Sequence, residues 1–385
     1  MATSDPPIRV SLQQPVLPAY RVPVFHELSK RPGIDLTVYY GDMSNSPSSV
    51  SDVPFHASFV HLREMRLAGH PILWHGPQWT GASRRRSDTL VLSWDIHYAS
   101  LIPSLLRAKR NGVRTVLWGH GYSKREQPWR RWPRERVAGL ADALLFYNRR
   151  AADAYLENGW DRRRVFVAPN AIDQSPIQAA RDYWASRPDE LDAFKKENGL
   201  GSEPMILFVS RLDPNNRLDL LLEALKKIEP MQPTIQVVVI GNGADEQTRL
   251  TAMRDRLGLS DRVRFLGPIY DERSLAPWFL CSKLFCYPAN IGLSILHAFG
   301  YGLPVITSDQ IGAQNPEIES LEHDANGLTY ADADADALGQ AILTILGDES
   351  TRARLSAGAY RTASQTYSLS AMVDGMVSAI RGEAV

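Results

Sequence analysis

Residues 289–307 decide the fold, and they read A-N-I-G-L-S-I-L-H-A-F-G-Y-G-L-P-V-I-T. The stretch follows a short apolar run at 283–287 and a proline, and it ends in a second apolar run. This pattern predicts a strand, then a helix that opens on Asn290, Gly292 and Ser294, then another strand. Such a helix start offers free N–H groups and the positive end of a dipole, which together favour an anion.

Short apolar runs alternate with helical patterns on both sides of this stretch. In the second half of the chain, strands are predicted at 205–210, 235–240, 263–266, 284–287 and 305–308. In the first half, they are predicted at 9–13, 34–40, 89–94, 114–118, 143–147 and 164–168. Apolar strands that alternate with helices indicate parallel sheets covered on both faces. We therefore predict an α/β fold with two doubly wound, Rossmann-like domains in tandem.

A polar, helical segment at 174–203 separates the two repeats of this pattern. We expect an N-terminal domain at 1–185 and a C-terminal domain at 186–365. Ligands of such sheets bind at the carboxyl ends of the strands. With two domains facing each other, the expected site is the cleft between them.

The composition is that of a folded protein, because 44% of the 385 residues are apolar and 22% are charged. The 43 basic and 43 acidic residues balance, so the global charge does not favour nucleic acid. Cys281 and Cys286 are too few for a disulfide framework and have no partners for a zinc site. We find no secretory pattern at the start and no apolar stretch of the roughly 18 residues that span a membrane. We expect a cytoplasmic protein.

Two strand-end loops carry residues suited to a transferred group. His120 lies between two glycines directly after a strand, where it can orient or polarise a substrate hydroxyl. The alternative is a turn histidine bonded to its own backbone. Arg211 and Arg217 flank the next such loop and can clamp a pyrophosphate from two sides. The alternative there is a pair of solvated loop charges.

Three further positions complete this set. Gly241 and Gly243 begin like a dinucleotide-binding fingerprint, but position 246 is Glu246, which excludes NAD and FAD. The loop at 267–269 can offer main-chain hydrogen bonds to a flat base, or it is an ordinary turn. His297, inside the helix of the opening stretch, would lie near a ribose or would be a satisfied core histidine.

Two other features invite a functional interpretation. Asp332, Asp334 and Asp336 resemble a metal triplet, but the glycine and glutamate of a calcium loop are replaced by Ala337 and Leu343. These aspartates are predicted to cap the next helix instead.

The segment from Lys124 to Arg136 carries six basic residues together with Trp129 and Trp132. It is either a solvated loop and helix start or a peripheral patch for anionic lipid. Single-stranded nucleic acid has no other support in the chain.

The order of these motifs resembles the family-4 glycosyltransferases of the GT-B fold. The motifs are S-R-L-D-P-N-N-R at 210–217, I-G-N-G at 240–243, R-F-L-G-P at 264–268 and the opening stretch. The resemblance is strong over 204–350 and weaker over 8–173, where W-G-H-G and P-N-A-I-D occupy the expected places. It implies two facing Rossmann-like domains with an inter-domain cleft, and a nucleotide-sugar donor held mainly by the C-terminal one. It also implies retention of anomeric configuration, no metal cofactor, and a final helix at 366–385 that crosses back to the N-terminal domain.

The resemblance also assigns roles to single residues. His120 and Arg211 match the family's catalytic histidine and phosphate-binding arginine. The family's lysine falls on Asn216, beside Arg217, and its two glutamates fall on Ala289 and His297. The donor-binding residues that it implies are Asn216, Arg217, Gly241, Gly243, Gly267, Ile269, Asn290, Ile291, Gly292, Leu293, Ser294, His297 and Glu317.

The resemblance predicts a glycosyltransferase that moves a sugar from a UDP- or GDP-linked donor to an acceptor hydroxyl in glycan or polysaccharide assembly. Its partners would be the donor and a glycan or lipid-linked acceptor, with peripheral membrane contact through the segment from Lys124 to Arg136 at the inner face of the membrane. Two alternatives stay open. One is a nucleotide-sugar epimerase on the same fold, and the other is a degenerate, nucleotide-binding partner subunit.

Overall fold

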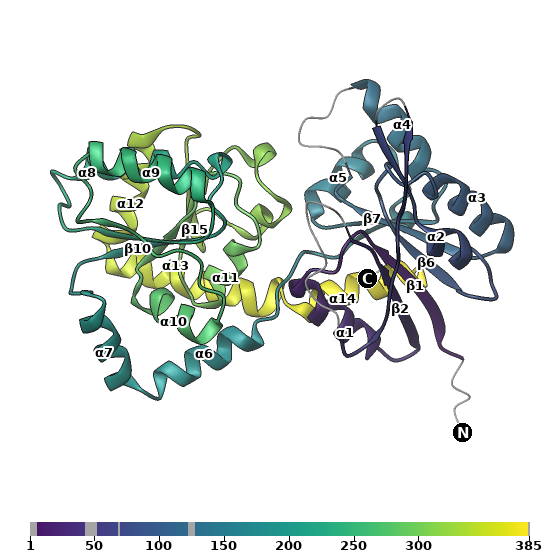
Figure 1. Ribbon diagram of the computed structural model, residues 1–385, viewed down its shortest axis with the longest axis horizontal. Helices are drawn as coiled ribbons and strands as arrows, with labels where there is room; N and C mark the ends of the chain where they lie inside the picture. Colours follow the sequence, from purple (N-terminus) through teal and green to yellow (C-terminus); the bar gives the residue numbers. More distant parts are fainter. Residues whose placement is uncertain (1–5, 43–51, 68–69, 122–127, 384–385) are drawn as a thin grey trace. The chain divides into compact units, whose positions relative to one another are not determined.

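The computed structural model describes residues 6–42, 52–67, 70–121 and 128–383, and it divides into two compact units. The first unit comprises Met1–Ile172 and Leu369–Val385, and the second comprises Asp173–Ser368. Each unit contains a parallel sheet with helices packed against it (Figure 1). The predicted pair of Rossmann-like α/β domains is therefore confirmed.

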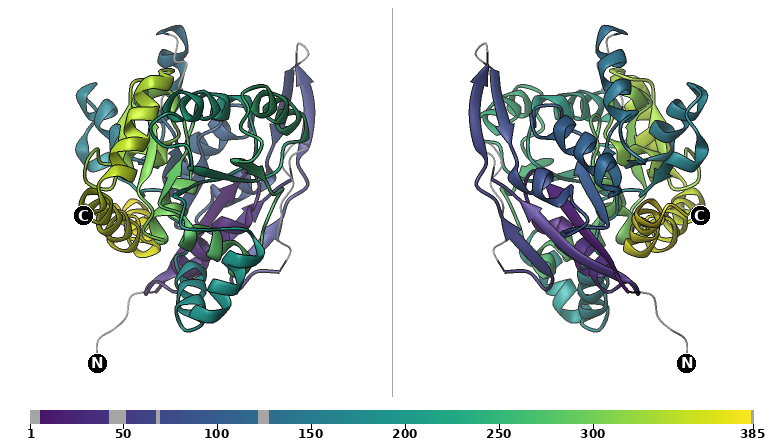
Figure 2. Two further views of the ribbon diagram at one scale, coloured as in Figure 1. Left: turned by 90° about the vertical axis from the view of Figure 1, so that its left-hand side faces the viewer. Right: turned by 90° about the vertical axis from the view of Figure 1, so that its right-hand side faces the viewer.

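The first unit is built on a seven-stranded parallel sheet in the order β3-β2-β1-β6-β7-β8-β9. Its strands are β1 (Ile8–Gln14), β2 (Ile34–Tyr40), β3 (His56–Phe59), β6 (Thr89–Ser93), β7 (Arg114–Gly119), β8 (Ala143–Phe146) and β9 (Val165–Val167). β4 (Arg63–Leu67) and β5 (His70–Trp74) form a separate antiparallel ribbon (Figure 2). Every residue of β8 is buried, because a central parallel strand is covered on both faces.

Helices cover both faces of this sheet. They are α1 (Val22–Ser29), α2 (Gly76–Gly81), α3 (Leu101–Asn111), α4 (Pro128–Ala138), α5 (Arg149–Glu157) and α14 (Leu369–Arg381). Phe25 of α1 and Met376 of α14 share one core with Trp118 of β7. Leu117, the neighbour of Trp118, belongs to the core of the opposite face with Leu105 of α3. Successive strand residues point to opposite faces, so one strand supplies both cores.

The second unit repeats the design with a six-stranded parallel sheet in the order β12-β11-β10-β13-β14-β15. Its strands are β10 (Met205–Val209), β11 (Gln236–Ile240), β12 (Val263–Phe265), β13 (Leu284–Cys286), β14 (Val305–Ser308) and β15 (Gly327–Tyr330). Its helices are α6 (Ser175–Ala185), α7 (Pro188–Glu197), α8 (Leu218–Ile228), α9 (Ala244–Arg256), α10 (Glu272–Cys281), α11 (Ser294–Gly300), α12 (Ala335–Gly347) and α13 (Glu349–Arg361).

The borders of the units differ from the predicted 185/186 and 365/366. Helix α6 was assigned to the N-terminal domain, but it belongs to the second unit, where it packs on α10 and α11. Gln174 donates to the carbonyl of Leu296 at 3.2 Å, and Arg181 donates to the carbonyl of Gly300 at 2.8 Å. These contacts join residues more than a hundred positions apart, so local sequence does not reveal them.

Helix α14 lies in the first unit, although it follows the whole second unit in the chain. Asp374 pairs with Arg31 at 2.9 Å, and the carbonyl of Ala379 accepts a hydrogen bond from Arg114 at 3.0 Å. Gly375 lets the helix approach β9 closely, because a Cβ there would lie 2.0 Å from the carbonyl oxygen of Val167. The end of the chain therefore completes the core of the unit that contains its beginning.

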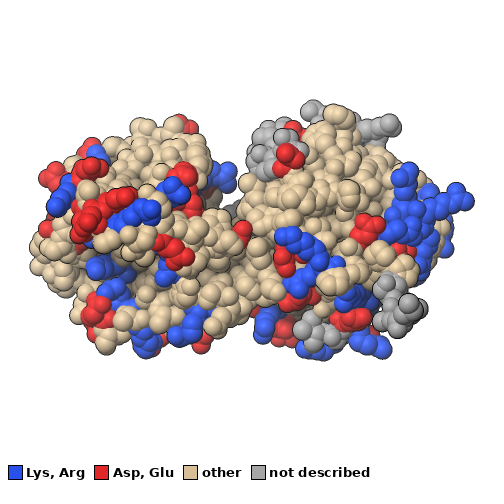
Figure 3. Space-filling view, turned by 90° about the horizontal axis from the view of Figure 1, so that it is seen from below, with Lys and Arg blue, Asp and Glu red and all other residues tan. Residues whose placement is uncertain are grey.

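Although the net charge of the chain is zero, the first unit has a basic surface on one side. Lys and Arg side chains gather at one side of the first unit, at the right of Figure 3. Arg84, Arg85 and Arg86 are exposed in the loop after α2, and Arg84 lies 3.7 Å from the place of a Cβ on Gly112, which follows α3. None of the helices in the described ranges is long and apolar enough to span a membrane.

A buried polar network links the ends of β1 and β6. Gln78 donates to Gln13 at 3.1 Å and accepts from Ser100 at 2.6 Å, and Ser100 accepts from the N–H of His75 at 3.0 Å. The His75 ring is fully buried, and neither of its nitrogens has a hydrogen-bond partner among the described residues. Burial lowers the pKa of His75 from 6.5 to about 4.

This histidine predicts a pH-dependent stability. Between pH 6.5 and about 4 the unfolded chain binds a proton at His75 and the folded chain does not, so stability falls as the pH drops through that window. Urea unfolding should show a loss of about 2 kcal/mol between pH 7 and pH 5 from this group. His75→Gln should flatten that part of the pH dependence, whereas His56→Gln, at an exposed histidine of the same unit, should not. An unchanged pH dependence in His75→Gln would contradict this assignment.

Candidate active site

The predicted donor-binding residues lie in the loops at the carboxyl ends of the strands of the second unit. The loop after β10 packs directly on the loop after β11, because the N–H of Leu212 donates to the carbonyl of Asn242 at 2.7 Å. A Cβ at Gly241 would lie 1.7 Å from the carbonyl oxygen of Ser210, and one at Gly243 would lie 2.4 Å from that of Leu212. Both glycines are therefore required for the close approach of these two loops.

Asn216 joins the loop after β10 to the loop after β13. Asn216 is 3% exposed, and its side chain donates to the carbonyl of Arg211 at 2.7 Å. The main-chain carbonyl of Asn216 accepts from the N–H of Ala289 at 3.2 Å. Asn290 donates to its side-chain oxygen at 3.4 Å. Asn216 is predicted to bind the donor, and the structure shows that its side-chain amide also positions Arg211 and Asn290.

The helix predicted within residues 289–307 begins at Ser294, and the residues before it form a tight loop. Asn290 has a left-handed backbone (φ 60°), and α11 has only seven residues. The N–H of Ile291 donates to the Gln314 side chain at 2.7 Å. This N–H is therefore already used and does not take part in the donor contact predicted for Ile291. The first hydrogen bond of the helical turn runs from Ile295 to the carbonyl of Gly292 at 3.1 Å.

The N–H groups of Gly292, Leu293 and Ser294 precede this hydrogen bond, and they are the part of the predicted anion site that fits the structure. Glu317, 5% exposed, is close to them, because its Oε2 lies 3.9 Å from the place of a Cβ on Gly292. A side chain at Gly292 would fill the space between the loop and Glu317. The loop and Glu317 are therefore brought together as predicted.

The arginines and the remaining loop residues take different places. Arg211 is exposed beyond the end of β10. Arg217 has a left-handed backbone (φ 56°) and pairs with Asp219 at 3.2 Å, so its predicted substitution for a lysine competes with this ion pair. The carbonyl of Gly267 accepts from the N–H of Gly241 at 3.0 Å, and Ile269 is half-buried beyond it.

The side chain of His297 contacts helix α10 and not the loops that hold the other predicted residues. Its Nε2 is 2.9 Å from a carboxylate oxygen of Glu272 in α10, and its ring stacks on Phe279 at 4.7 Å. Tyr301 donates to the same oxygen of Glu272 at 2.5 Å. Burial raises the pKa of Glu272, but the hydrogen bonds from His297 and Tyr301 lower it by more than burial raises it. The pKa of Glu272 is therefore below its usual value. The structure thus favours the alternative of a satisfied histidine that joins α10 to α11.

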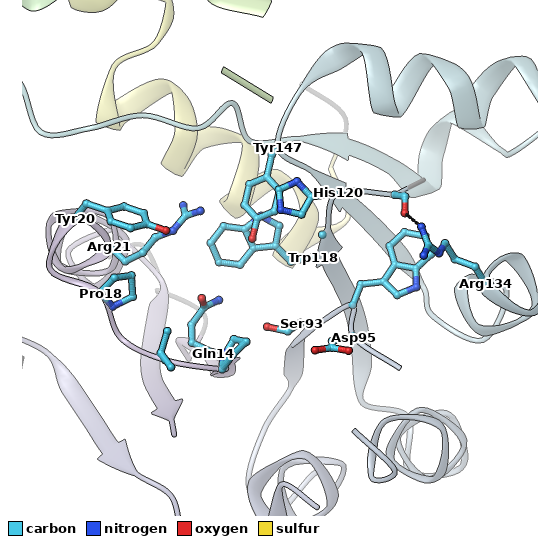
Figure 4. A pocket seen from close by; sticks show the side chains of 15 residues that line it. Gln14, Pro18, Tyr20, Arg21, Ser93, Asp95, Trp118, His120, Arg134 and Tyr147 are labelled. Atoms are coloured by element: carbon cyan, nitrogen blue, oxygen red, sulfur yellow. Dashed lines mark hydrogen bonds between the residues drawn. The ribbon is translucent and has the colours of Figure 1, made fainter. Parts of the chain in front are cut away.

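His120 lies in the first unit, in a pocket of about 450 Å³ at the carboxyl ends of β1, β6 and β7 (Figure 4). The His120 side chain is exposed, and its ring packs on that of Tyr147, with centroids 4.6 Å apart. Gln14, Arg21, Asp95 and Trp118 also line the pocket. Sequence analysis missed these residues, although Gln14, Asp95 and Trp118 stand at or near strand ends in the same way as His120.

Of the two other features, the aspartates have structural roles. Asp334 caps α12 by accepting from the N–H groups of Asp336 and Ala337, which confirms the predicted cap. Asp332 accepts from Ser308 at 2.7 Å, and Asp336 pairs with Lys227 at 2.6 Å.

The basic segment from Lys124 to Arg136 lies partly outside the described residues, which resume at Pro128 with α4. Within α4, Trp132 is 62% exposed and the guanidinium of Arg136 lies 4.8 Å from its ring.

The chain resembles known glycosyltransferases in sequence. Residues 190–362 match the family described as glycosyl transferases group 1. A GDP-mannose-dependent alpha-(1-6)-phosphatidylinositol monomannoside mannosyltransferase of Mycolicibacterium smegmatis is 25% identical over 74% of this chain and 75% of its own. A D-inositol 3-phosphate glycosyltransferase of Xylanimonas cellulosilytica is 28% identical over 60% of this chain. The chain spans about half the length of that enzyme and of its relative from Geodermatophilus obscurus.

Solved structures share the fold over nearly the whole chain. A glycosyltransferase of Rickettsia africae covers 97% of this chain and 98% of its own at a TM-score of 0.72, with 15% sequence identity. HepE of Anabaena in complex with UDP covers 97% of this chain and 99% of its own at a TM-score of 0.68, with 16% identity. The predicted family resemblance and the GT-B fold are both confirmed.

The contact between the loops after β10 and β11 yields a prediction. Gly241→Ala should destabilise the second unit by about 2 kcal/mol or more, because the methyl group would collide with the carbonyl of Ser210. Thermal unfolding should record this as a fall in Tm of roughly 5 °C. Gly312→Ala is the matched control, since nothing lies within 4 Å of a Cβ there. Equal melting temperatures for the two variants would show that the loops do not depend on this close approach.

Proposed function

We propose that the chain is a glycosyltransferase that transfers a sugar from a nucleotide-diphosphate donor to an acceptor hydroxyl, as its similarity to the group 1 glycosyl transferases and its GT-B fold suggest. We further propose that the anomeric configuration is retained and that no metal ion is required. This proposal rests on one observation, which is that hydrogen bonds join the loops after β10, β11 and β13 of the second unit. They bring the exposed Arg211 and the N–H groups of Gly292, Leu293 and Ser294 to one edge of the sheet.

The proposed mechanism follows from where charge develops. Breaking the bond between the sugar and the diphosphate leaves negative charge on the departing phosphate. The guanidinium of Arg211 and the N–H groups at 292–294 stabilise this charge as it forms. They supply the positive charge that a metal ion supplies in other transferases, so we expect transfer to continue in EDTA.

Retention fits the residues that replace the usual carboxylates. Ala289 cannot act as a base, and His297 is bonded to Glu272. In the proposed mechanism the acceptor hydroxyl attacks from the side of the leaving group, and the departing phosphate takes its proton. His120, through its exposed ring, would orient the reacting sugar.

The names of the related proteins guide the choice of substrates. One relative uses GDP-mannose and acts on phosphatidylinositol monomannoside, and others act on D-inositol 3-phosphate. HepE of Anabaena was solved with UDP. We therefore propose a UDP- or GDP-linked donor and a glycan or lipid-linked acceptor.

We also propose a cytoplasmic location with peripheral membrane contact. Support comes from the six basic residues, Trp129 and Trp132 between Lys124 and Arg136. Flotation with anionic lipid vesicles measures this contact.

The donor site predicts a nucleotide that stabilises the fold. GDP or UDP should raise the Tm of the wild-type chain, with or without EDTA, because ligand that binds only the folded state stabilises it. Arg211→Ala should weaken nucleotide binding about 10- to 100-fold, the size expected for lost hydrogen bonds to a charged group. Arg256→Ala, at an exposed arginine of the same unit, should bind like the wild type. If no nucleoside diphosphate changes the Tm of the wild type, the donor site is disproved.

A further inference from the structure

We propose that the pocket of the first unit binds a phosphate group through Arg21, and that this phosphate belongs to the acceptor. The proposal deepens the proposed function and rests on it. It assigns the acceptor to a chemical class, the phosphate monoesters or diesters of a sugar or polyol. In the proposed function, the donor phosphates bind to Arg211 and to the loop at 292–294 of the second unit.

Arg21 is a cation buried without a counter-charge. It is 5% exposed, and among the described residues it forms no ion pair. Its guanidinium donates to the side-chain oxygen of Asn170 at 2.9 Å and contacts the sulfur of Met372 at 3.7 Å. A buried charge is costly unless it is paired, so this arrangement needs an explanation.

Aromatic rings offset part of that cost. The guanidinium carbon lies 5.2 Å from the ring centroid of Tyr20, 4.9 Å from that of Trp118 and 5.2 Å from that of Tyr147. The negative faces of these rings attract a cation, but they do not accept its in-plane hydrogen bonds. Because Arg21 lines the pocket, a ligand oxygen can reach it (Figure 4).

Other groups that line this pocket are also donors without an acceptor. Gln14 Nε2, Trp94 Nε1 and Trp118 Nε1 are buried, and none has a hydrogen-bond partner among the described residues. These three atoms are closed to solvent, so a ligand in the pocket would be bound by the part of Arg21 that lines it. A phosphate brings several strong acceptor oxygens and negative charge together.

The one carboxylate in the pocket lining does not meet this need. Asp95 accepts from the ring of His97 at 2.7 Å and from its N–H at 2.9 Å. The pocket thus combines a buried cation, Arg21, with a carboxylate that is already hydrogen-bonded. Its volume of about 450 Å³ falls in the range of small-ligand sites.

The pocket also relates the phosphate to the reacting group. Arg21 and His120 both pack against the ring of Tyr147, with distances of 5.2 Å and 4.6 Å. A phosphorylated sugar or polyol held on Arg21 would therefore direct a hydroxyl toward His120. Arg21 would set which acceptors are used, and His120 would help to orient the reacting groups.

The test is calorimetric binding with two probes that differ only in one phosphate group, D-myo-inositol 3-phosphate and neutral myo-inositol. The wild type should bind the phosphate probe at least tenfold more tightly than the neutral one. Arg21→Gln should lose that preference, and Arg21→Lys should keep part of it. Arg107→Gln is the matched control, because Arg107 also packs on a tryptophan ring, that of Trp79 at 4.4 Å, outside the pocket. It should keep the full preference.

Binding of GDP and UDP to the same variants separates the two sources of phosphate. Arg21→Gln should bind nucleotide like the wild type, which also shows that it is folded. Loss of nucleotide binding in Arg21→Gln with an unchanged Tm would mean that Arg21 serves the donor, and it would overturn the assignment to the acceptor. Equal wild-type affinity for the two inositol probes would overturn the proposal without any variant. Failure of the wild type to bind nucleotide would refute the proposed function, whereas the comparison of the two probes would still test whether the pocket binds a phosphate group.

Discussion

The side chain of Asn216 holds the candidate donor site together. It is almost fully buried and donates to the carbonyl of Arg211, while the main-chain carbonyl of Asn216 accepts from the N–H of Ala289. Through these bonds the loop after β10 and the loop after β13 become one surface. The adjacent loop after β11 joins them because Gly241 and Gly243 allow backbone contact. The position of Arg211 relative to the N–H groups at 292–294 depends on these contacts more than on any single ligand-binding residue.

Much of the fold could be predicted because parallel strands covered on both faces leave a simple pattern in the sequence. Buried runs such as those of β8 and β10 are apolar at successive positions, and the helices between them follow. The ribbon of β4 and β5 was not predicted, since it lies outside both parallel sheets. The place of α6 and α14 depends on contacts between distant residues, such as that of Arg31 with Asp374.

The site was harder to predict than the fold for the same reason. A motif shows which residue follows a strand, but not which partner its side chain takes. Asn216 bonds to backbone, Arg217 pairs with Asp219, and His297 pairs with Glu272, which lies in another helix. Arg21 was missed because its burial among three rings comes from η1 (Ala19–Arg21), β7 and the residue after β8, which only the folded chain brings together.

The two units show a shared chemical preference. In the second, an exposed arginine and main-chain N–H groups lie at the strand ends, and in the first, a buried arginine lines a pocket. Both arrangements offer hydrogen-bond donors and positive charge where a ligand would supply oxygen and negative charge. An enzyme that joins a nucleotide-diphosphate sugar to a phosphorylated acceptor would need both.

Hydrogen–deuterium exchange with and without GDP or UDP tests the central claim most directly, because it reports where the nucleotide acts. If the joined loops are the donor site, the nucleotide should slow exchange at 211–217 and at 289–296 in the second unit. Exchange in the β4–β5 ribbon should be unchanged. Protection confined to other segments, with these two loops exchanging at the same rate in both samples, would contradict the account.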